Sequence, residues 1–309
     1  MNVLSLFDGI SCGRVALERA GIKVDNYFAS EIDKYAMKIS NKNYPDIIQL
    51  GDINEWRTWD LPKIDLILAG SPCQGFSYAG NKLNFDDPRS KLFFTFVDIL
   101  KHYNPEHFLL ENVRMKGIWK DLISEYVGVA PVAINSALVS AQSRSRLYWT
   151  NIEGITQPED REIYLKDIVE SGVVDREKSY CIDANYSKGG GLKRYYDEAR
   201  RQVVLDKTYQ STRRLMVKEG VYLRRRGHGY LPNMEYFADK CPALFTSMSD
   251  YTILDEADYR KLTPLECERL QTLPEKYTEG ISNTQRYKTI GNGWTIDVIV
   301  HILNFMEIK

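Results

Sequence analysis

The chain has 309 residues, enough for one large domain or two of ordinary size, and enough to bury a full α/β core. Its composition is 43% hydrophobic and 27% charged, as in ordinary globular proteins, and no stretch approaches the length of a membrane span. The formal net charge of −1 excludes binding of nucleic acid through overall charge, so any such surface must come from a local excess of Lys and Arg.

The first half of the chain alternates short apolar runs with helical patterns. These runs predict strands over residues 2–7, 27–30, 47–50, 64–69 and 108–110. The helical patterns cover residues 14–20, which Gly21 ends, 32–43 and 90–103. Strands that alternate with helices predict βαβ units in a parallel sheet.

Polar residues follow these predicted strands. They are Asp8, Glu31, Asp52, Cys73 and Glu111. Because ligands bind beyond the carboxyl ends of parallel strands, the pattern predicts a functional site on one rim of the sheet. The first turn contains Gly9 and Gly13, and Glu31 follows the second strand. Both features suit an adenosine-type cofactor, although a plain structural turn is the alternative.

The pattern changes after residue 150. Residues 151–258 are polar, rich in Tyr and Arg, and show no clear alternation of strand and helix. Within them, segment 188–230 has twelve Lys and Arg and four acids, hence a net charge of +8 that is typical of a lobe facing a polyanion. Regular structure returns with a helix that begins at Pro264 after the N-cap Thr263, and with an apolar helix over 295–305.

Five scattered cysteines, with no C-x-x-C pair, support neither a disulfide framework nor a metal site. Cys73 differs from the other four because it stands in Gly-Ser-Pro-Cys-Gln-Gly, where Pro72 fixes the backbone before it and Gly75 follows it. We therefore weigh a positioned thiol beside a hinged loop against a small buried hydrophobic residue. The N-terminus has no basic stretch and Asp8 interrupts its apolar run, so we expect no signal peptide and a cytoplasmic protein.

At this point the sequence resembles the DNA cytosine-5 methyltransferases, and the resemblance covers nearly the whole chain. The matching motifs occur in the family's order: Phe7-Asp8-Gly9 with Gly13, Pro72-Cys73-Gln74, Glu111-Asn112-Val113, Gln142-Ser143-Arg144-Ser145-Arg146, Arg260 through Gln271, and Gly291-Asn292-Gly293. The resemblance implies a Rossmann-like α/β sheet that uses S-adenosylmethionine, with helices on both faces. It also implies a catalytic domain over 1–150 and 260–309 and a smaller, irregular target-recognition domain over 151–259.

The implied reaction explains these residue types. Attack of the Cys73 thiolate on C6 of a flipped-out cytosine makes C5 nucleophilic enough to accept a methyl group. The resemblance implies that Glu111 protonates or hydrogen-bonds N3 of the cytosine. It also implies that Arg146 and Arg144 hold the base or a nearby phosphate. Surface salt bridges are the alternative for the two arginines.

The resemblance also implies binding residues. Contacts to S-adenosylmethionine, and to its product S-adenosylhomocysteine, fall on Phe7, Asp8, Gly9, Gly13, Glu31, Ile32, Asp52, Ile53, Pro72, Leu92, Asn292 and Trp294. Contacts to duplex DNA fall on Gln74, Ser77, Lys188, Arg224, Arg225 and Arg226, although a solvated basic face is the alternative for the arginine run. The family's mobile nucleophile loop corresponds to residues 74–91. No metal is expected.

The chain departs from many bacterial members in two places. It has Ser11-Cys12 where they have two glycines, and its first motif is similar to that of the animal de novo DNA methyltransferases. It has Trp294 where many members have a smaller apolar residue. Two other functions stay open: an RNA cytosine-5 methyltransferase acting on transfer RNA, and a non-catalytic DNA-binding relative. A companion restriction endonuclease and a prokaryotic or phage-infected cell are the expected setting.

Overall fold

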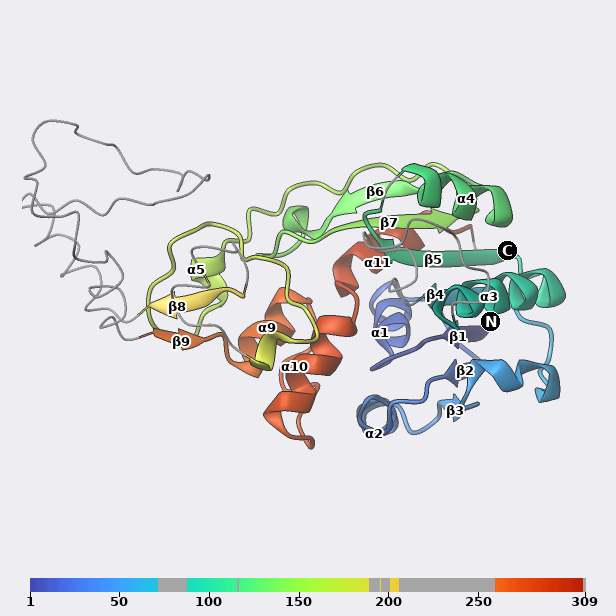
Figure 1. Cartoon of the computed structure of the whole chain (residues 1–309), viewed down its shortest axis with the longest axis horizontal. Helices are drawn as coiled ribbons and strands as arrows, with labels where there is room; N and C mark the ends of the chain where they lie inside the picture. The colour runs from blue at the N-terminus through green and yellow to red at the C-terminus, as the bar shows by residue number, and fades with distance from the viewer. Residues whose placement is uncertain (72–87, 116, 189–194, 196–200, 206–258, 308–309) are drawn as a thin grey trace, which may run out of the picture.

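The computed structural model describes residues 1–71, 88–115, 117–188, 195, 201–205 and 259–307. Within these ranges seven strands form one sheet in the order β3-β2-β1-β4-β5-β7-β6, and β8 and β9 form a separate antiparallel pair (Figure 1). The strands are β1 (Asn2–Leu6), β2 (Asn26–Ser30), β3 (Ile48–Gln49), β4 (Leu66–Gly70), β5 (His107–Val113), β6 (Val132–Asn135), β7 (Ser145–Thr150), β8 (Val203–Leu205) and β9 (Tyr259–Lys261). The helices are α1 (Cys12–Arg19), α2 (Lys34–Asn43), α3 (Pro88–Tyr103), α4 (Gly117–Val127), α5 (Leu165–Ile168), α9 (Pro264–Leu270), α10 (Asn283–Asn292) and α11 (Ile296–Leu303), with short 3₁₀ turns η1 (Ile53–Thr58), η3 (Ser136–Leu138) and η4 (Tyr186–Lys188).

The parallel part of the sheet confirms the predicted βαβ units. β3, β2, β1, β4 and β5 run parallel, and the strand order reverses between β1 and β4. Such a reversal leaves a crevice beyond the carboxyl ends of the two central strands, because their connections leave toward opposite faces of the sheet. The loop from Phe7 and the end of β4 at Gly70 therefore flank the crevice.

The predicted parallel sheet continues at one edge into antiparallel strands that the sequence did not indicate. β7 pairs antiparallel with β5 and with β6, so the sheet is mixed. β6, β7 and α4 were not predicted from the sequence, because β6 has only four residues and β7 begins on the polar residues Ser145 and Arg146. β5 also continues beyond the predicted end at Leu110, so Glu111 lies within a strand, opposite Gly70 and Tyr148.

Helices cover both faces of the sheet, as predicted. α1, α2 and α11 contribute to one apolar cluster, which includes Val15, Ile39 and Ile299. α3, α4 and η1 contribute to the other, which includes Phe96 and Ile123. Within the part of the chain that the structure describes, no helix is long and apolar enough to cross a membrane.

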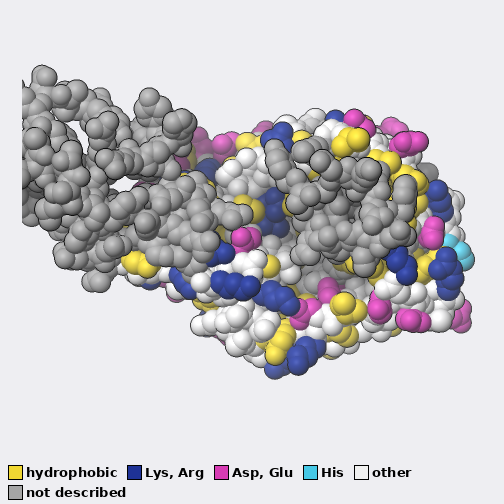
Figure 2. All heavy atoms as spheres, in the orientation of Figure 1, with side chains coloured by type: hydrophobic (Ala, Val, Ile, Leu, Met, Phe, Trp, Pro, Cys, Tyr) yellow, Lys and Arg dark blue, Asp and Glu magenta, His cyan; other side chains and the backbone are white. Residues whose placement is uncertain are grey.

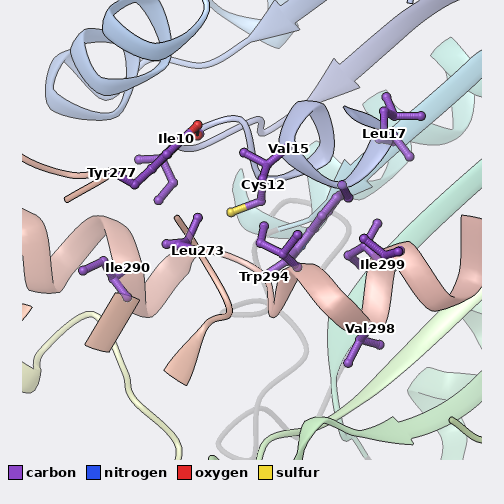
Figure 3. Packing of buried hydrophobic residues seen from close by; sticks show 14 of the residues in the cluster. Ile10, Cys12, Val15, Leu17, Leu273, Tyr277, Ile290, Trp294, Val298 and Ile299 are labelled. Carbon is purple, nitrogen blue, oxygen red and sulfur yellow. Dashed lines mark hydrogen bonds between the residues drawn. The ribbon is translucent and has the colours of Figure 1, made fainter. Parts of the chain in front are cut away.

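The last helices return to the first one. α11 packs on α1, and its Asp297 binds both Arg19 and Arg161. Figure 3 shows Trp294, which precedes α11, pointing toward Cys12 and Val15 of α1. This return brings Trp294 and α11 against α1. Thr263 caps α9 as predicted, since its hydroxyl accepts a hydrogen bond from Glu266 N.

Candidate active site at the edge of the sheet

The loop between β1 and α1 has an unusual backbone. Phe7, Gly9 and Ser11 all have positive φ angles, of 57°, 62° and 59°. A Cβ atom added to Gly9 would meet nothing within 4 Å, so open space lies beside this glycine. Its backbone N–H donates to Glu31 Oε2 at 2.8 Å, and this bond joins the ends of β1 and β2. The loop therefore leaves room for a ligand beside its backbone.

Acidic side chains fix the next two strand ends. Glu31 Oε1 accepts from the N–H groups of Ile32 and Asp33, both at 2.8 Å, and the Ile32 side chain beside it is 74% exposed. Asp52 is exposed and caps η1, where its Oδ1 accepts from Asn54 N at 2.9 Å. The rim thus offers two carboxylates and an exposed apolar side chain, while the neighbouring Ile53 is buried.

Asp8 has different surroundings, although it belongs to the same predicted set. Its carboxylate is buried and accepts from the hydroxyls of Ser11 at 2.6 Å and Tyr27 at 2.8 Å. Burial raises the pKa of Asp8 to about 6, although these hydroxyl donors oppose the rise. The side chain of Asp8 thus supports the loop from inside the protein.

Glycines explain how the chain accommodates Trp294. A Cβ atom on Gly70 would lie 3.0 Å from Trp294 Nε1, so the indole lies against bare backbone at the end of β4. Gly13 on α1 leaves room for other side chains, since a Cβ there would lie 2.6 Å from Leu68 Cδ1 and 2.9 Å from the Tyr27 hydroxyl. Trp294 is buried, whereas the preceding Asn292 is exposed and Leu92 on α3 is half-buried.

Glu111 and Arg146 form an ion pair from adjacent strands. Arg146 Nε lies 3.0 Å from Glu111 Oε1, and their side chains are only 14% and 11% exposed. Burial is the largest influence on the pKa of Arg146 and lowers it, but the carboxylate of Glu111, together with Cys181 and Tyr148, raises it, so the pKa lies above its ordinary value. Two largely buried, oppositely charged groups thus face each other at the edge of the sheet.

Arg144 does not join this pair. Its guanidinium is buried and donates to three backbone carbonyls, those of Ile182 at 2.9 Å, Gly291 at 3.3 Å and Gly293 at 3.0 Å. It therefore fastens β7 to segment 181–182 and to the end of α10.

A buried set of polar side chains continues this connection. Gln142 Nε2 donates to Gln271 Oε1, and Gln271 Nε2 donates to the carbonyls of Ile290 and Gly293. Gln142 Oε1 accepts from Ile182 N at 2.8 Å. We call Gln142, Arg144, Gln271 and Thr295, whose hydroxyl donates to Gln271, the buried polar network. The network joins three motifs that lie far apart in the sequence, namely residues 142–146, 260–271 and 291–293.

The structure brings together only some of the predicted residues. Pro72, Cys73, Gln74, Ser77 and Arg224 to Arg226 lie outside the described residues. Asn112 Nδ2 donates to Ser71 O at 3.3 Å, so β5 holds the residue two positions before Cys73. No group of three His, Cys, Asp or Glu that could hold a metal occurs among the described side chains.

Lys188 ends η4 and is exposed. Figure 2 shows Lys and Arg side chains gathered over the part of the molecule that Figure 1 labels β9, α9 and α10. Some arginines of these elements are paired with acids: Arg260 of β9 with Glu266, and Arg286 of α10 with Glu268. Two contacts of this site were not predicted from the sequence: the thiol of Cys181 beside Arg146, and the connection from Gln271 to the last motif.

Comparison with known proteins identifies the family. Residues 1–123 and 129–307 match the model of the C-5 cytosine-specific DNA methylase family. The Type II methyltransferase M.NlaX of Neisseria lactamica is 30% identical over 99% of this chain and 96% of its own length. The Type II methyltransferase M1.ScrFI of Lactococcus lactis subsp. cremoris is 31% identical over 96% of this chain and 76% of its own. The structure of the S. pombe Dnmt2 methyltransferase has the same fold, with a TM-score of 0.66, 18% identity, and coverage of 98% of this chain and 97% of that one.

Proposed function

Since this chain belongs to the C-5 cytosine-specific DNA methylase family and is a DNA cytosine-5 methyltransferase, we propose that Cys73, Glu111 and Arg146 carry its reaction. The observation that supports this most is the largely buried ion pair of Glu111 and Arg146, which lies one strand from the end of β4. Cys73 follows that strand end by three residues. The three side chains would then act on one base.

Family and fold imply a methyl donor of the S-adenosylmethionine type, and the residues of the rim fit such a group. Open space beside Gly9 admits it, Glu31 and Asp52 offer carboxylates to ribose hydroxyls and the adenine amino group, and Ile32 offers an apolar surface to the ring. When bound, S-adenosylmethionine supplies the methyl group and leaves as S-adenosylhomocysteine. We propose that Phe7, Ile53, Pro72, Leu92 and Asn292 complete the site, while Asp8, Gly13 and Trp294 shape it from behind.

The protein side chains make the base reactive. The thiolate of Cys73 forms a bond to C6, and the electron pair of the C5–C6 double bond becomes available at C5. Glu111 holds a proton at N3, which neutralises the charge that develops on the ring, and Arg146 fixes Glu111 and the base. After C5 has accepted the methyl group, its proton passes to a base such as water, the C5–C6 double bond re-forms, the Cys73 thiolate is expelled, and the N3 proton returns to Glu111. Arg144, whose guanidinium is occupied by carbonyls, acts as a support.

DNA recognition is assigned to the second region of the chain. We propose that residues 1–150 and 260–309 form the catalytic domain and 151–259 the target-recognition domain. The net charge of +8 over 188–230 supports contact with phosphates by Lys188 and Arg224 to Arg226. Gln74 and Ser77 would lie against the displaced base. The Type II names of the relatives support a companion restriction endonuclease and a cytoplasmic setting in a prokaryotic cell.

The test is transfer of a labelled methyl group from S-adenosylmethionine to genomic DNA, followed by bisulfite sequencing. We expect modified cytosines in one defined sequence context. Cys73→Ser should abolish transfer, and Glu111→Gln should slow it roughly hundredfold, as is typical when a general acid is lost. Both variants should still bind S-adenosylmethionine.

Transfer RNA is the comparison substrate. Labelling of transfer RNA in preference to duplex DNA would contradict the assignment, because the closest functional alternative is an RNA methyltransferase of the same fold. Full activity in Cys73→Ser would remove that thiol from the mechanism.

A further inference from the structure

Cys181 lies outside the sequence motifs, yet its sulfur lies between the two arginines of the Gln-x-Arg-x-Arg motif. Arg144 Nη1 is 3.3 Å and Arg146 Nη2 is 3.7 Å from Cys181 Sγ. The thiol is not in a disulfide, is partly buried, and donates to Ile182 O at 3.5 Å. Its lone pairs are therefore free to accept from the two guanidinium groups.

The backbone beside this thiol is held from three sides. Ile182 N donates to Gln142 Oε1 at 2.8 Å, and Ile182 O accepts from Arg144 Nη1 at 2.9 Å. The next residue, Asp183, packs directly on Gly291, where an added Cβ atom would lie 2.3 Å from the Asp183 carbonyl carbon. The sulfur of Cys181 thus has a position fixed by the buried polar network.

Arg146 is the partner that depends on this position. Its Nε contacts Glu111 Oε1 at 3.0 Å, its Nη1 donates to Ser145 O at 3.0 Å, and its Nη2 faces Cys181 Sγ. A neutral thiol is a weak acceptor and cannot compete with the carboxylate of Glu111 for the guanidinium. It can, however, stop the guanidinium from rotating away from Glu111.

We infer that Cys181 is a positioning residue for methyl transfer, which transmits the geometry of the buried polar network to Arg146 and so keeps Arg146 against Glu111. The inference rests on the roles proposed above for Glu111 and Arg146. A plain packing thiol would contribute stability alone, and its replacement would act independently of Arg146. The two cases differ in how the Cys181 and Arg146 substitutions combine.

The experiment measures the single-turnover rate of methyl transfer to duplex DNA and the KM for S-adenosylmethionine, with the full-length chain. Cys181→Val removes the acceptor and nearly keeps the volume. We expect the rate to fall about tenfold, the size of one lost hydrogen bond to a charged group, with little change in KM. Cys181→Ser keeps an acceptor and should retain a rate within about threefold of the wild type. Cys181→Ala removes the acceptor without adding bulk, and its rate of methyl transfer should fall as much as that of Cys181→Val.

The matched control is Cys267→Ala, since Cys267 is a fully buried thiol on α9 with no hydrogen bond to either arginine among the described contacts. Its rate should equal that of the wild type. In an Arg146→Ala background, Cys181→Val should cause no further loss of rate. A further tenfold loss there would overturn the positioning role and leave a structural one.

The two proposals fail in different ways. An unchanged rate in both Cys181→Val and Cys181→Ala, beside a strongly impaired Arg146→Ala, would overturn the role of Cys181 alone. An unchanged rate in Arg146→Ala would overturn the proposed role of Arg146, and the role of Cys181 with it.

Discussion

Two regions of the same sheet edge are built in different ways. The cofactor edge, formed by residues 7–13, 31–33 and 52–54, has many short-range bonds, such as those from Ile32 and Asp33 to Glu31, beside long-range ones such as that from Tyr277 to Ile10. The catalytic edge, formed by 111–112, 142–146, 181–183 and 291–293, is fixed by bonds between distant residues, such as that from Arg144 to Gly293, 149 positions away. The cofactor edge therefore depends more on local turns than the catalytic edge does.

The largest expected effect concerns the catalytic edge. Arg144→Met should lower the free energy of unfolding by about 4 kcal/mol, because it leaves three buried carbonyls without their charged donor. Urea denaturation would measure the loss. Arg114→Met is the matched control, since Arg114 is exposed and its replacement should change stability by less than about 0.5 kcal/mol. Equal stability of the two variants would show that the polar network does not hold this edge together.

The next effect concerns the one buried acid of the cofactor edge. The pKa of Asp8 is raised from 3.8 to about 6 in the folded state, so the folded protein binds this proton more tightly than the unfolded chain does. Its favourable contribution is full below about pH 4 and is lost as the pH rises through about 6. Asp8→Asn should therefore gain roughly 3 kcal/mol of unfolding free energy relative to the wild type between pH 4 and pH 7.

Denaturation curves at four pH values would measure this change for Asp8. Asp52→Asn is the control, because Asp52 is exposed. A difference between Asp8→Asn and the wild type that stays constant with pH would mean that Asp8 is ionised at little cost.

The smallest effect separates the two edges most clearly. Gly9→Ala should lower the free energy of unfolding by about 1 kcal/mol, because the positive φ disfavours alanine while no atom lies within 4 Å of the new Cβ. Gly291→Ala should cost about 3 kcal/mol, because its Cβ would overlap the backbone of Asp183. Thermal unfolding of the two variants gives the comparison. A larger loss of stability for Gly9→Ala than for Gly291→Ala would contradict the difference between the two edges.

The same contrast explains what the sequence could predict. Gly9, Glu31 and Asp52 follow apolar runs directly, so their place at one rim could be inferred from spacing alone. Arg144 was predicted to contact base or phosphate, because a motif gives a residue type but does not show which carbonyls will surround it. Cys181 carried no signal, since its importance arises only when β7 and segment 181–183 pack together. The antiparallel β7 was missed for a related reason, as its first residues are polar side chains of the site.

Covalent trapping tests the central claim most directly. A duplex that carries 5-fluorocytosine in the target context has no C5 proton to lose, so the enzyme should remain bonded to C6 after methyl transfer. We predict a denaturation-resistant complex whose linked peptide contains Cys73. Glu111→Gln should form this complex slowly, and Cys73→Ser should not form it. A linkage through another cysteine, or methylation of ordinary DNA by a chain that forms no such complex, would contradict the mechanism.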